Sequence, residues 1–433
     1  MHLKRIPMDT SRLRVGMYVG ALDRPWTETP FVFQGFVIKD SFDIDQLQSY
    51  CSEVYVEIDR GKLTETEIRS IANDGGADER QPRRQTKSAE LPNWLKRWLY
   101  RTRLGELLAA RARNRTGAYV RSATVRMEAP HAKQAYKQCV NSYKRIFEEA
   151  RRTGVVDIKV VIRSVKPVIE SILRNPDAMA WTVFSGKRSN RHYSRAVATA
   201  VWAVMFGRHL GFDRAGLKNL AVGGLLLDIG YVSLPDEILN TMGAFYKDEL
   251  LQVRKHVQAG MEVLRRSNID EPAVLDMLKY HHERYDGSGY PNQLKGRDIT
   301  PHGRIAGIVD CYDAMTTKSS YSPAQGAYAA ARELNEMRDQ QFHAEVVEQF
   351  LKTIGMFPTG SVVELNDGSA GLVLEQNPEN SLHPKVVLLR TPSGELFDPP
   401  RTLKEDDWAD SKVWIAKGHE HGAYGIDPME HFA

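Results

Sequence analysis

The chain of 433 residues has few cysteines and no long apolar run. Its three cysteines, Cys51, Cys139 and Cys311, are far apart and form no redox-like or metal-like pair. A disulfide framework is therefore excluded, and a reducing, cytoplasmic location is expected. The longest apolar stretch, residues 196–207, is too short to span a bilayer, and the N-terminus lacks the apolar core of a secretion signal. We expect no transmembrane segment.

Neither sign of charge dominates, because 59 Lys and Arg residues face 55 Asp and Glu residues. A formal net charge of +4 gives no general argument for nucleic acid as a partner, so any basic surface must be local. Hydrophobic residues at 42% and charged residues at 26% exclude a disordered chain and a fibre. The length suggests two or three folded units.

The residue composition and the hydrophobic pattern change several times along the chain, and these changes predict a multidomain protein. Aromatic, β-rich runs near the N-terminus predict a small α/β module. Amphipathic helical runs predict a central all-α domain, and short apolar runs broken by Asn-Asp-Gly and Pro-Ser-Gly predict a small β-module after it. The predicted divisions are an α/β module (1–65), a polar linker (66–92), a basic helical segment (93–154), the all-α domain (155–355), the β-module (356–405) and a tail (406–433).

The helical segment 93–154 is rich in arginine in its first half. Such a helix can bind an acidic partner, a membrane surface or nucleic acid. The favoured interpretation is a solvated helix face whose arginine stems cover a neighbouring domain.

Imidazoles and carboxylates are concentrated in the all-α domain, at positions that a helix bundle can bring together. They are Asp228, His256, His281, His282 and Asp310. This is the ligand mixture of hydrolytic iron, manganese or zinc centres. Because neighbouring residues on a helix point about 100° apart, His281 and His282 can serve two ions, or one ion and a substrate oxygen.

The peptide from His281 to Pro291, His-His-Glu-Arg-Tyr-Asp-Gly-Ser-Gly-Tyr-Pro, gives these histidines a specific context. Gly287 and Gly289 permit a tight turn, which Tyr290 and Pro291 stiffen. This string resembles the signature of the HD-GYP family, bacterial phosphodiesterases that hydrolyse cyclic di-GMP.

The resemblance extends over about residues 155–355. Residues 225–239 are similar to the family's His-Asp segment, residues 255–260 to its middle histidine and residues 304–315 to its closing aspartate helix. Residues 13–19 resemble the N-terminal module often found before this domain, and residues 355–361 resemble its usual β-rich extension.

The resemblance also reveals departures from the family pattern. The His-Asp dipeptide is replaced by Leu227-Asp228, and the family's first ligand histidine falls on Arg195. Tyr231 stands where a lysine usually reaches a phosphate, and the basic residue expected after Asp-Ala-Met is replaced within residues 318–321. Loss of an outer-shell partner typically lowers metal affinity or activity 10- to 100-fold, so loss of two imidazole ligands should lower them further.

The resemblance implies that the remaining ligands are divided unevenly. Asp228, His256 and His281 match the set for a second ion, with His282 facing a possible third position, whereas the first ion keeps only Asp228 and Asp310. We therefore expect a divalent metal, Fe or Mn, with fewer ions than in active members.

Two further residues bear on the missing ion. We expect Arg195 to occupy its place and to pair with Asp310 or Asp228, and Leu227 to fill the vacated ligand space. His192, one helical turn before Arg195, is a possible substitute ligand.

Charged residues near the signature receive weaker assignments. Asp286 is expected to make a turn bond, and Glu283 and Asp313 helix-face contacts. Lys295 and Arg304 are candidates for binding a nucleotide phosphate, with surface charge as the equal alternative.

Two functions from different classes follow. The favoured hypothesis is a catalytically impaired HD-GYP protein that senses cyclic di-GMP or docks partners through its Gly-Tyr-Pro turn, which the resemblance links to GGDEF-type diguanylate cyclases. The alternative is a working phosphodiesterase for cyclic di-GMP or a related cyclic dinucleotide, with Asp228 as its catalytic ligand. A third hypothesis, in which the basic segment binds nucleic acid or an anionic membrane, is weaker.

Overall fold

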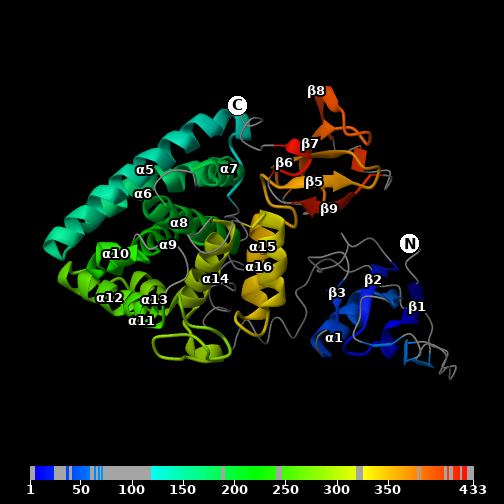
Figure 1. Ribbon diagram of the computed structural model, residues 1–433, viewed down its shortest axis with the longest axis horizontal. Helices are drawn as coiled ribbons and strands as arrows, with labels where there is room; N and C mark the ends of the chain where they lie inside the picture. Colours follow the sequence, from blue (N-terminus) through cyan, green and yellow to red (C-terminus); the bar gives the residue numbers. More distant parts are fainter. Residues whose placement is uncertain are drawn as a thin grey trace. The chain divides into compact units, whose positions relative to one another are not determined.

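The computed structural model describes residues 5–23, 36–38, 41–58, 63–64, 67–68, 70–71, 119–186, 191–239, 246–317, 325–377, 380, 382–403, 407–408, 413–419 and 422–426. The chain forms two compact units, residues 1–91 and 92–433, and Figure 1 labels their elements. The segments 72–118 and 318–321, which include most of the predicted linker and the arginine-rich half of the basic segment, lie outside the described residues.

The N-terminal unit is a small antiparallel sheet with one described α-helix, as predicted. Its strands are β1 (Arg5–Asp9), β2 (Tyr18–Leu22), β3 (Phe36–Val37) and β4 (Glu53–Glu57), in the order β1-β4-β2-β3, and α1 spans Ser41–Tyr50. Alternating apolar residues form its core because successive strand side chains point to opposite faces. Ile68 is fully buried in this core, so the unit extends past the predicted boundary at residue 65.

The central domain is helical, as predicted, with no strand among the described residues between 155 and 355 (Figure 1). Its α-helices are α5 (Val125–Thr153), α6 (Ile158–Arg174), α7 (Pro176–Gly186), α8 (Arg191–Leu210), α9 (Arg214–Leu226), α10 (Asp236–Leu239), α11 (Lys247–Arg254), α12 (His256–Arg266), α13 (Pro272–Tyr280), α14 (Pro301–Thr316), α15 (Ala327–Glu336) and α16 (Ala344–Ile354). Two 3₁₀ helices, η3 (Ile229–Ser233) and η4 (Gly296–Asp298), connect them.

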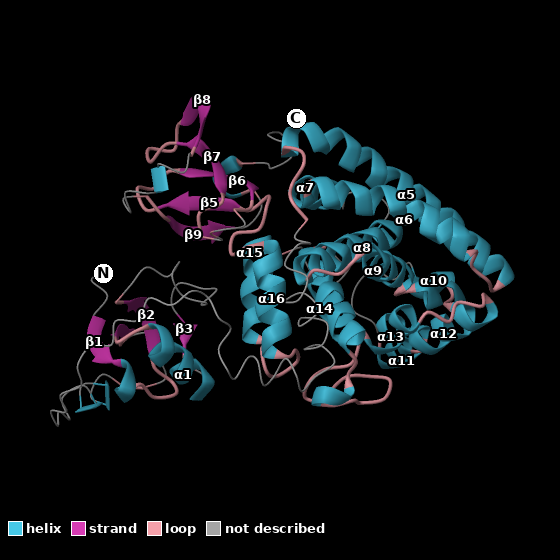
Figure 2. Ribbon diagram, turned by 180° about the vertical axis from the view of Figure 1, so that it is seen from behind, coloured by secondary structure: helices cyan, strands magenta, loops and turns pink. Residues whose placement is uncertain are grey.

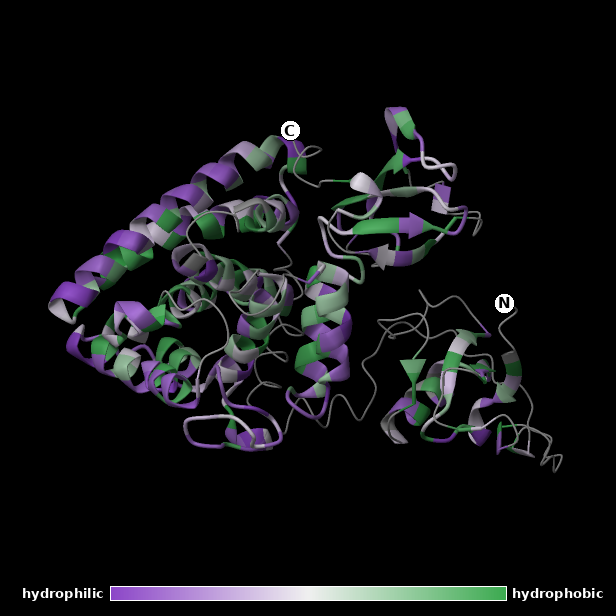
Figure 3. Cartoon of the chain, in the orientation of Figure 1, coloured by the Kyte–Doolittle hydropathy of each residue, from purple (hydrophilic) through white to green (hydrophobic). Residues whose placement is uncertain are grey.

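The long helix α5 belongs to this domain and is not a separate segment. The Thr124 hydroxyl accepts a hydrogen bond from the first turn, and the helix ends at Gly154, whose φ of 75° suits glycine. Its buried residues recur every three or four positions and pack against α6 and α7. Its outer face is polar, with exposed Lys133 and Lys137, and α5 accordingly mixes hydrophilic and hydrophobic colours along its length in Figure 3.

One described segment, Arg214–Ser233, is long and apolar enough by length and composition alone to cross a membrane, a property that buried core helices share. It comprises α9 and η3, and 61% of it is buried inside the protein. Because α9 packs against α8 and α13, its apolarity is accounted for by the core of the helical domain.

The C-terminal part is a five-stranded antiparallel sheet, seen from behind in Figure 2. The strands are β5 (Val362–Leu365), β6 (Ala370–Glu375), β7 (Lys385–Arg390), β8 (Leu396–Thr402) and β9 (Ile415–His419), in the order β8-β7-β6-β5-β9. The predicted end of this module at residue 405 is wrong. Residues 415–419 form an edge strand on β5, and Ile426 lies in the core, because the last strand pairs with the first across about fifty residues of chain.

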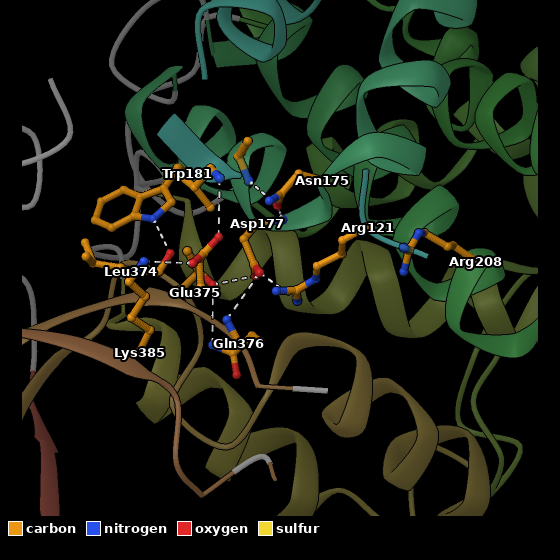
Figure 4. A network of polar contacts seen from close by, with 12 residues as sticks. Arg121, Asn175, Asp177, Trp181, Arg208, Leu374, Glu375, Gln376 and Lys385 are labelled. Carbon is orange, nitrogen blue, oxygen red and sulfur yellow. Dashed lines mark hydrogen bonds and ion pairs between the residues drawn. The ribbon is translucent and has the colours of Figure 1, made fainter. Parts of the chain in front are cut away.

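A buried carboxylate joins the sheet to the helical domain (Figure 4). Asp177, on α7, lies 2.8 Å from a guanidinium nitrogen of Arg121 and accepts hydrogen bonds from the Thr359 hydroxyl at 2.9 Å and the Gln376 backbone at 3.2 Å. The indole of Trp181 donates to the Leu374 carbonyl oxygen at 2.9 Å. Burial raises the pKa of Asp177 despite these partners.

Candidate metal centre

The site is built where three helical segments meet. Asp228 lies between α9 and η3, His256 is the first residue of α12, and His281 and His282 directly follow α13. The ligand atoms of these four residues all lie within 4.8 Å of one another. The structure thus brings together four of the five predicted ligands.

The innermost atoms are close enough to share one ion. Asp228 Oδ1 lies 3.4 Å from His256 Nε2 and 3.7 Å from His281 Nε2. The two Nε2 atoms are 3.3 Å apart, and both imidazoles are fully buried. Three donor atoms at such separations can converge on one cation at ordinary ligand distances of about 2.0–2.2 Å.

Backbone acceptors orient both imidazoles for ligation. His256 Nδ1 lies 2.6 Å from the Val253 carbonyl oxygen, and His281 Nδ1 lies 2.8 Å from that of Leu278. Because a carbonyl oxygen only accepts, each ring carries its proton on Nδ1 and directs its Nε2 lone pair inward. His282 Nε2 is buried and has no hydrogen-bond partner among the residues that the structure describes. An orphaned imidazole nitrogen beside two inward lone pairs and a carboxylate fits a divalent metal ion.

Electrostatics keep these groups in their ligating forms. Burial alone would raise the pKa of Asp228, but its contacts with the His281 and His256 rings and the charge of Arg195 hold it below its usual value. Burial, with His281 and His256 nearby, lowers the pKa of His282 well below its usual value. The site therefore offers an ionised carboxylate at Asp228 and a neutral imidazole at His282.

Asp310, the fifth predicted ligand, is engaged by Arg195 and lies outside the four-residue group. Its Oδ1 accepts a hydrogen bond from the Arg195 guanidinium at 2.6 Å, and Arg195 Nε lies 3.8 Å from Asp313 Oδ2. The predicted pairing of Arg195 with Asp310 is therefore present. Leu227, 2% exposed, lies in the core.

His192 is not brought to the group. Its Nε2 contacts the Leu239 carbonyl oxygen at 2.9 Å, and its side chain is exposed at the start of α8. His192 lies one helical turn before Arg195, but its side chain contacts Leu239, the last residue of α10.

Tyr231 lies against the metal ligands. Its ring meets that of His256 edge-on, with centroids 4.7 Å apart. Burial and the Asp228 charge raise the pKa of Tyr231 well above its usual value, so the phenol stays protonated and can donate a hydrogen bond.

The signature turn folds back onto the site. Gly287 has φ of 84°, and a Cβ on Gly289 would lie 2.4 Å from the His282 carbonyl oxygen, so both positions require glycine. The turn places the half-buried Tyr290 ring on His282, with centroids 4.5 Å apart and planes 24° apart. Tyr290 thus contacts the site, whereas Pro291 and, earlier in the turn, Asp286 and Ser288 are exposed.

Glu283 holds this turn, a role that we did not predict. Its buried carboxylate accepts hydrogen bonds from the backbone of Asn292 at 2.7 Å and of Leu294 at 2.9 Å. Asp286 makes the predicted turn bond, accepting from Ser288 at 2.8 Å. The available signal for Glu283 was its position directly after the two histidines and before the glycine-rich turn.

The two predicted phosphate-binding cations differ in their surroundings. Arg304 donates to the carbonyl oxygens of Ile299 at 2.9 Å and Gly296 at 3.2 Å, and so braces the loop after the signature. Lys295 is exposed on that loop.

Backbone contact sets the spacing between Asp228 and His256. A Cβ added to Gly230 would lie 1.8 Å from the His256 carbonyl oxygen and 2.6 Å from the Gly260 nitrogen. Glycine at 230 therefore lets η3 lie directly on α12.

Comparisons with known proteins agree with this architecture. Residues 182–346 match the HD domain family, and residues 3–161 match a domain of unknown function, DUF3391. A cyclic di-GMP phosphodiesterase of Pseudomonas aeruginosa is 28% identical over 89% of this chain and 84% of its own length.

Two other similarities cover less. A 3'3'-cGAMP-specific phosphodiesterase of Vibrio cholerae is 38% identical over 29% of this chain, which spans only 24% of that relative. A solved HD-GYP-type protein of Bdellovibrio bacteriovorus aligns with 80% of this chain and 98% of its own, at 13% identity and a TM-score of 0.41. Residues 182–346 are therefore similar to HD domains and residues 3–161 to DUF3391 domains, and the relatives of this chain include cyclic di-GMP phosphodiesterases.

Proposed function

We propose that this protein is a metal-dependent phosphodiesterase that hydrolyses a cyclic dinucleotide, with cyclic di-GMP as its first candidate substrate. The observation that carries the proposal is the group of Asp228, His256, His281 and His282, whose donor atoms converge and include an orphaned imidazole nitrogen. The names of the relatives support the substrate class.

The chain's own residues supply the donor set and its orientation. Asp228, His256, His281 and His282 would hold a divalent ion, Fe or Mn, which as a Lewis acid polarises a phosphoryl oxygen and lowers the pKa of water. The carbonyl oxygens of Val253 and Leu278 hold two of these imidazoles in the ligating tautomer. Tyr231 offers a neutral hydrogen bond to a phosphate oxygen.

Arg195 adds a fixed cation at the other side of the site. Its guanidinium lies 2.6 Å from Asp310 and neutralises a carboxylate that is only 6% exposed. A guanidinium stays charged at all physiological pH values, so it retains positive charge there without an ion. We infer that one ion and Arg195 share the task that two ions perform in the family pattern.

The residues at positions 195 and 227 favour a second candidate function, a catalytically impaired sensor or docking module. Arg195 and the apolar Leu227 together remove two imidazoles from the set that the HD-GYP resemblance implies. Such a protein would bind a cyclic dinucleotide without hydrolysing it. Docking of a GGDEF-type diguanylate cyclase would then use Pro291 and the exposed residues after it. For both candidate functions, a cytoplasmic location remains a prediction.

The deciding experiment is cyclic di-GMP turnover by the full chain, purified anaerobically with Fe(II) or Mn(II), with bound metal measured on the same sample. We expect metal-dependent hydrolysis that Asp228→Ala abolishes. Asp286→Ala, which removes an exposed carboxylate of the signature turn, serves as the matched control and should retain activity. Binding without turnover would support the sensor. If the protein neither binds nor hydrolyses cyclic di-GMP, both candidate functions are contradicted.

A further inference from the structure

Arg254 lies beside the signature turn, next to the metal ligands in sequence and in space. It is the last residue of α11, two positions before His256, and its side chain is exposed. Its guanidinium carbon lies 4.9 Å from the centroid of the Tyr290 ring. Because Tyr290 in turn stacks on His282, Arg254 is separated from the metal ligands by a single aromatic ring.

Three arginines surround this ring and the ligands, and they differ in what their donors contact. Arg195 donates to Asp310 at 2.6 Å. Arg284 donates to the carbonyl oxygens of His281 and Glu283, both at 3.0 Å. Arg254 makes no hydrogen bond or ion pair with any residue that the structure describes, so its donors are available to a ligand.

The placement of Arg254 suits an anion. A guanidinium held on an aromatic face keeps its N–H groups at its edge, where they can form two parallel bonds with a phosphate. The cation–π contact limits the motion of the side chain, so less conformational freedom is lost when a ligand binds. Tyr231, an uncharged phenol, occupies the position at which the HD-GYP resemblance implies a phosphate-binding lysine.

We propose that Arg254 grips a phosphate of the bound cyclic dinucleotide, on the solvent side of the Tyr290 ring. The inference rests on the proposed function, because it takes the substrate class from there. It assigns to α11 a direct part in substrate binding, besides its orientation of His256 through the Val253 carbonyl oxygen.

The test compares Arg254→Met, Arg254→Lys and the matched control Lys255→Met, which removes one positive charge from the adjacent exposed position. Calorimetry on the full chain, prepared without metal, measures the Kd for cyclic di-GMP and for cyclic di-AMP. KM, kcat and metal content are measured on Mn(II)-loaded protein. Arg254→Met should raise Kd and KM about tenfold or more, as expected for a lost charged hydrogen bond, for both dinucleotides.

The remaining readouts separate substrate binding from a structural role. Metal content and kcat should stay within about twofold of wild type, Arg254→Lys should recover part of the affinity, and Lys255→Met should change Kd less than twofold. Equal Kd and KM for Arg254→Met and Lys255→Met would overturn the proposal. So would a loss confined to cyclic di-GMP, which would assign Arg254 to a guanine edge. If wild type binds neither dinucleotide, the proposed function itself fails.

Discussion

The Arg195–Asp310 pair makes a quantitative prediction about metal stoichiometry. The perturbation is the double substitution Arg195→His with Leu227→His, which restores the two imidazoles that the HD-GYP pattern implies. Asp310 is 6% exposed and Arg195 27% exposed. Removing one partner of a buried pair costs about 3–5 kcal/mol, and the partial exposure of Arg195 places the expected loss near the lower end.

Metal binding should offset this loss. A ligand at 100 times its Kd stabilises the folded state by about 2.7 kcal/mol. The metal-free double variant should therefore unfold about 6–12 °C below wild type, and saturating Mn(II) should return it close to the wild-type Tm. Bound metal should rise from at most one ion per chain to two.

The assay is elemental analysis of bound metal together with thermal unfolding, with and without Mn(II). Arg195→Met with Leu227→His is the control, because it removes the guanidinium without supplying its imidazole. The control should lose stability and gain no second ion. Unchanged metal content in the double histidine variant would refute the inference that Arg195 occupies an ion's place.

Three further predictions concern stability. Glu283→Gln should lower the free energy of unfolding by about 1–3 kcal/mol in urea titrations, because one of the two N–H groups that Glu283 binds loses its acceptor. Asp286→Asn at the surface should cost under about 1 kcal/mol, and equal losses would contradict the assigned role of Glu283. Burial, with Glu348 nearby, raises the pKa of Glu345 from 4.5 to about 8. The stability that the neutral carboxyl contributes is therefore fully present below the unfolded-state pKa and is lost as pH rises to the folded-state value of about 8. The free energy of unfolding of Glu345→Gln should exceed that of wild type by about 3–5 kcal/mol at pH 8.5 and by almost nothing at pH 4, and a pH-independent difference would contradict this. Mn(II) at 100 times its Kd should raise the wild-type Tm by about 5–10 °C, and the Tm of Asp228→Ala should not respond; an equal response would place the ion elsewhere.

Local patterns were sufficient to predict most of the architecture. The helices of the central domain carry apolar residues at helical spacing, and the first strands of the C-terminal sheet are joined by turns with evident sequence signals. Residues 415–419 were missed because their pairing with β5 is non-local, and a short polar-flanked run carries no mark of its partner.

The candidate site was predictable in its donors and less so in their partners. Opposite charge suggested the pairing of Arg195 with Asp310, although these residues are 115 positions apart. The role of Glu283 depends on how the signature turn folds back to place two backbone N–H groups on one carboxylate. His192 shows the converse, because helical spacing placed it on the right face but could not reveal the Leu239 carbonyl oxygen that it contacts.

The contact of Gly230 with α12 has a consequence for how this site can change over time. Because backbone atoms set the distance between η3 and α12, Asp228 and His256 keep their separation whatever side chains occupy the rest of the site. The side of the site that holds Arg195 and Leu227 can therefore be rebuilt while the opposite side keeps its geometry.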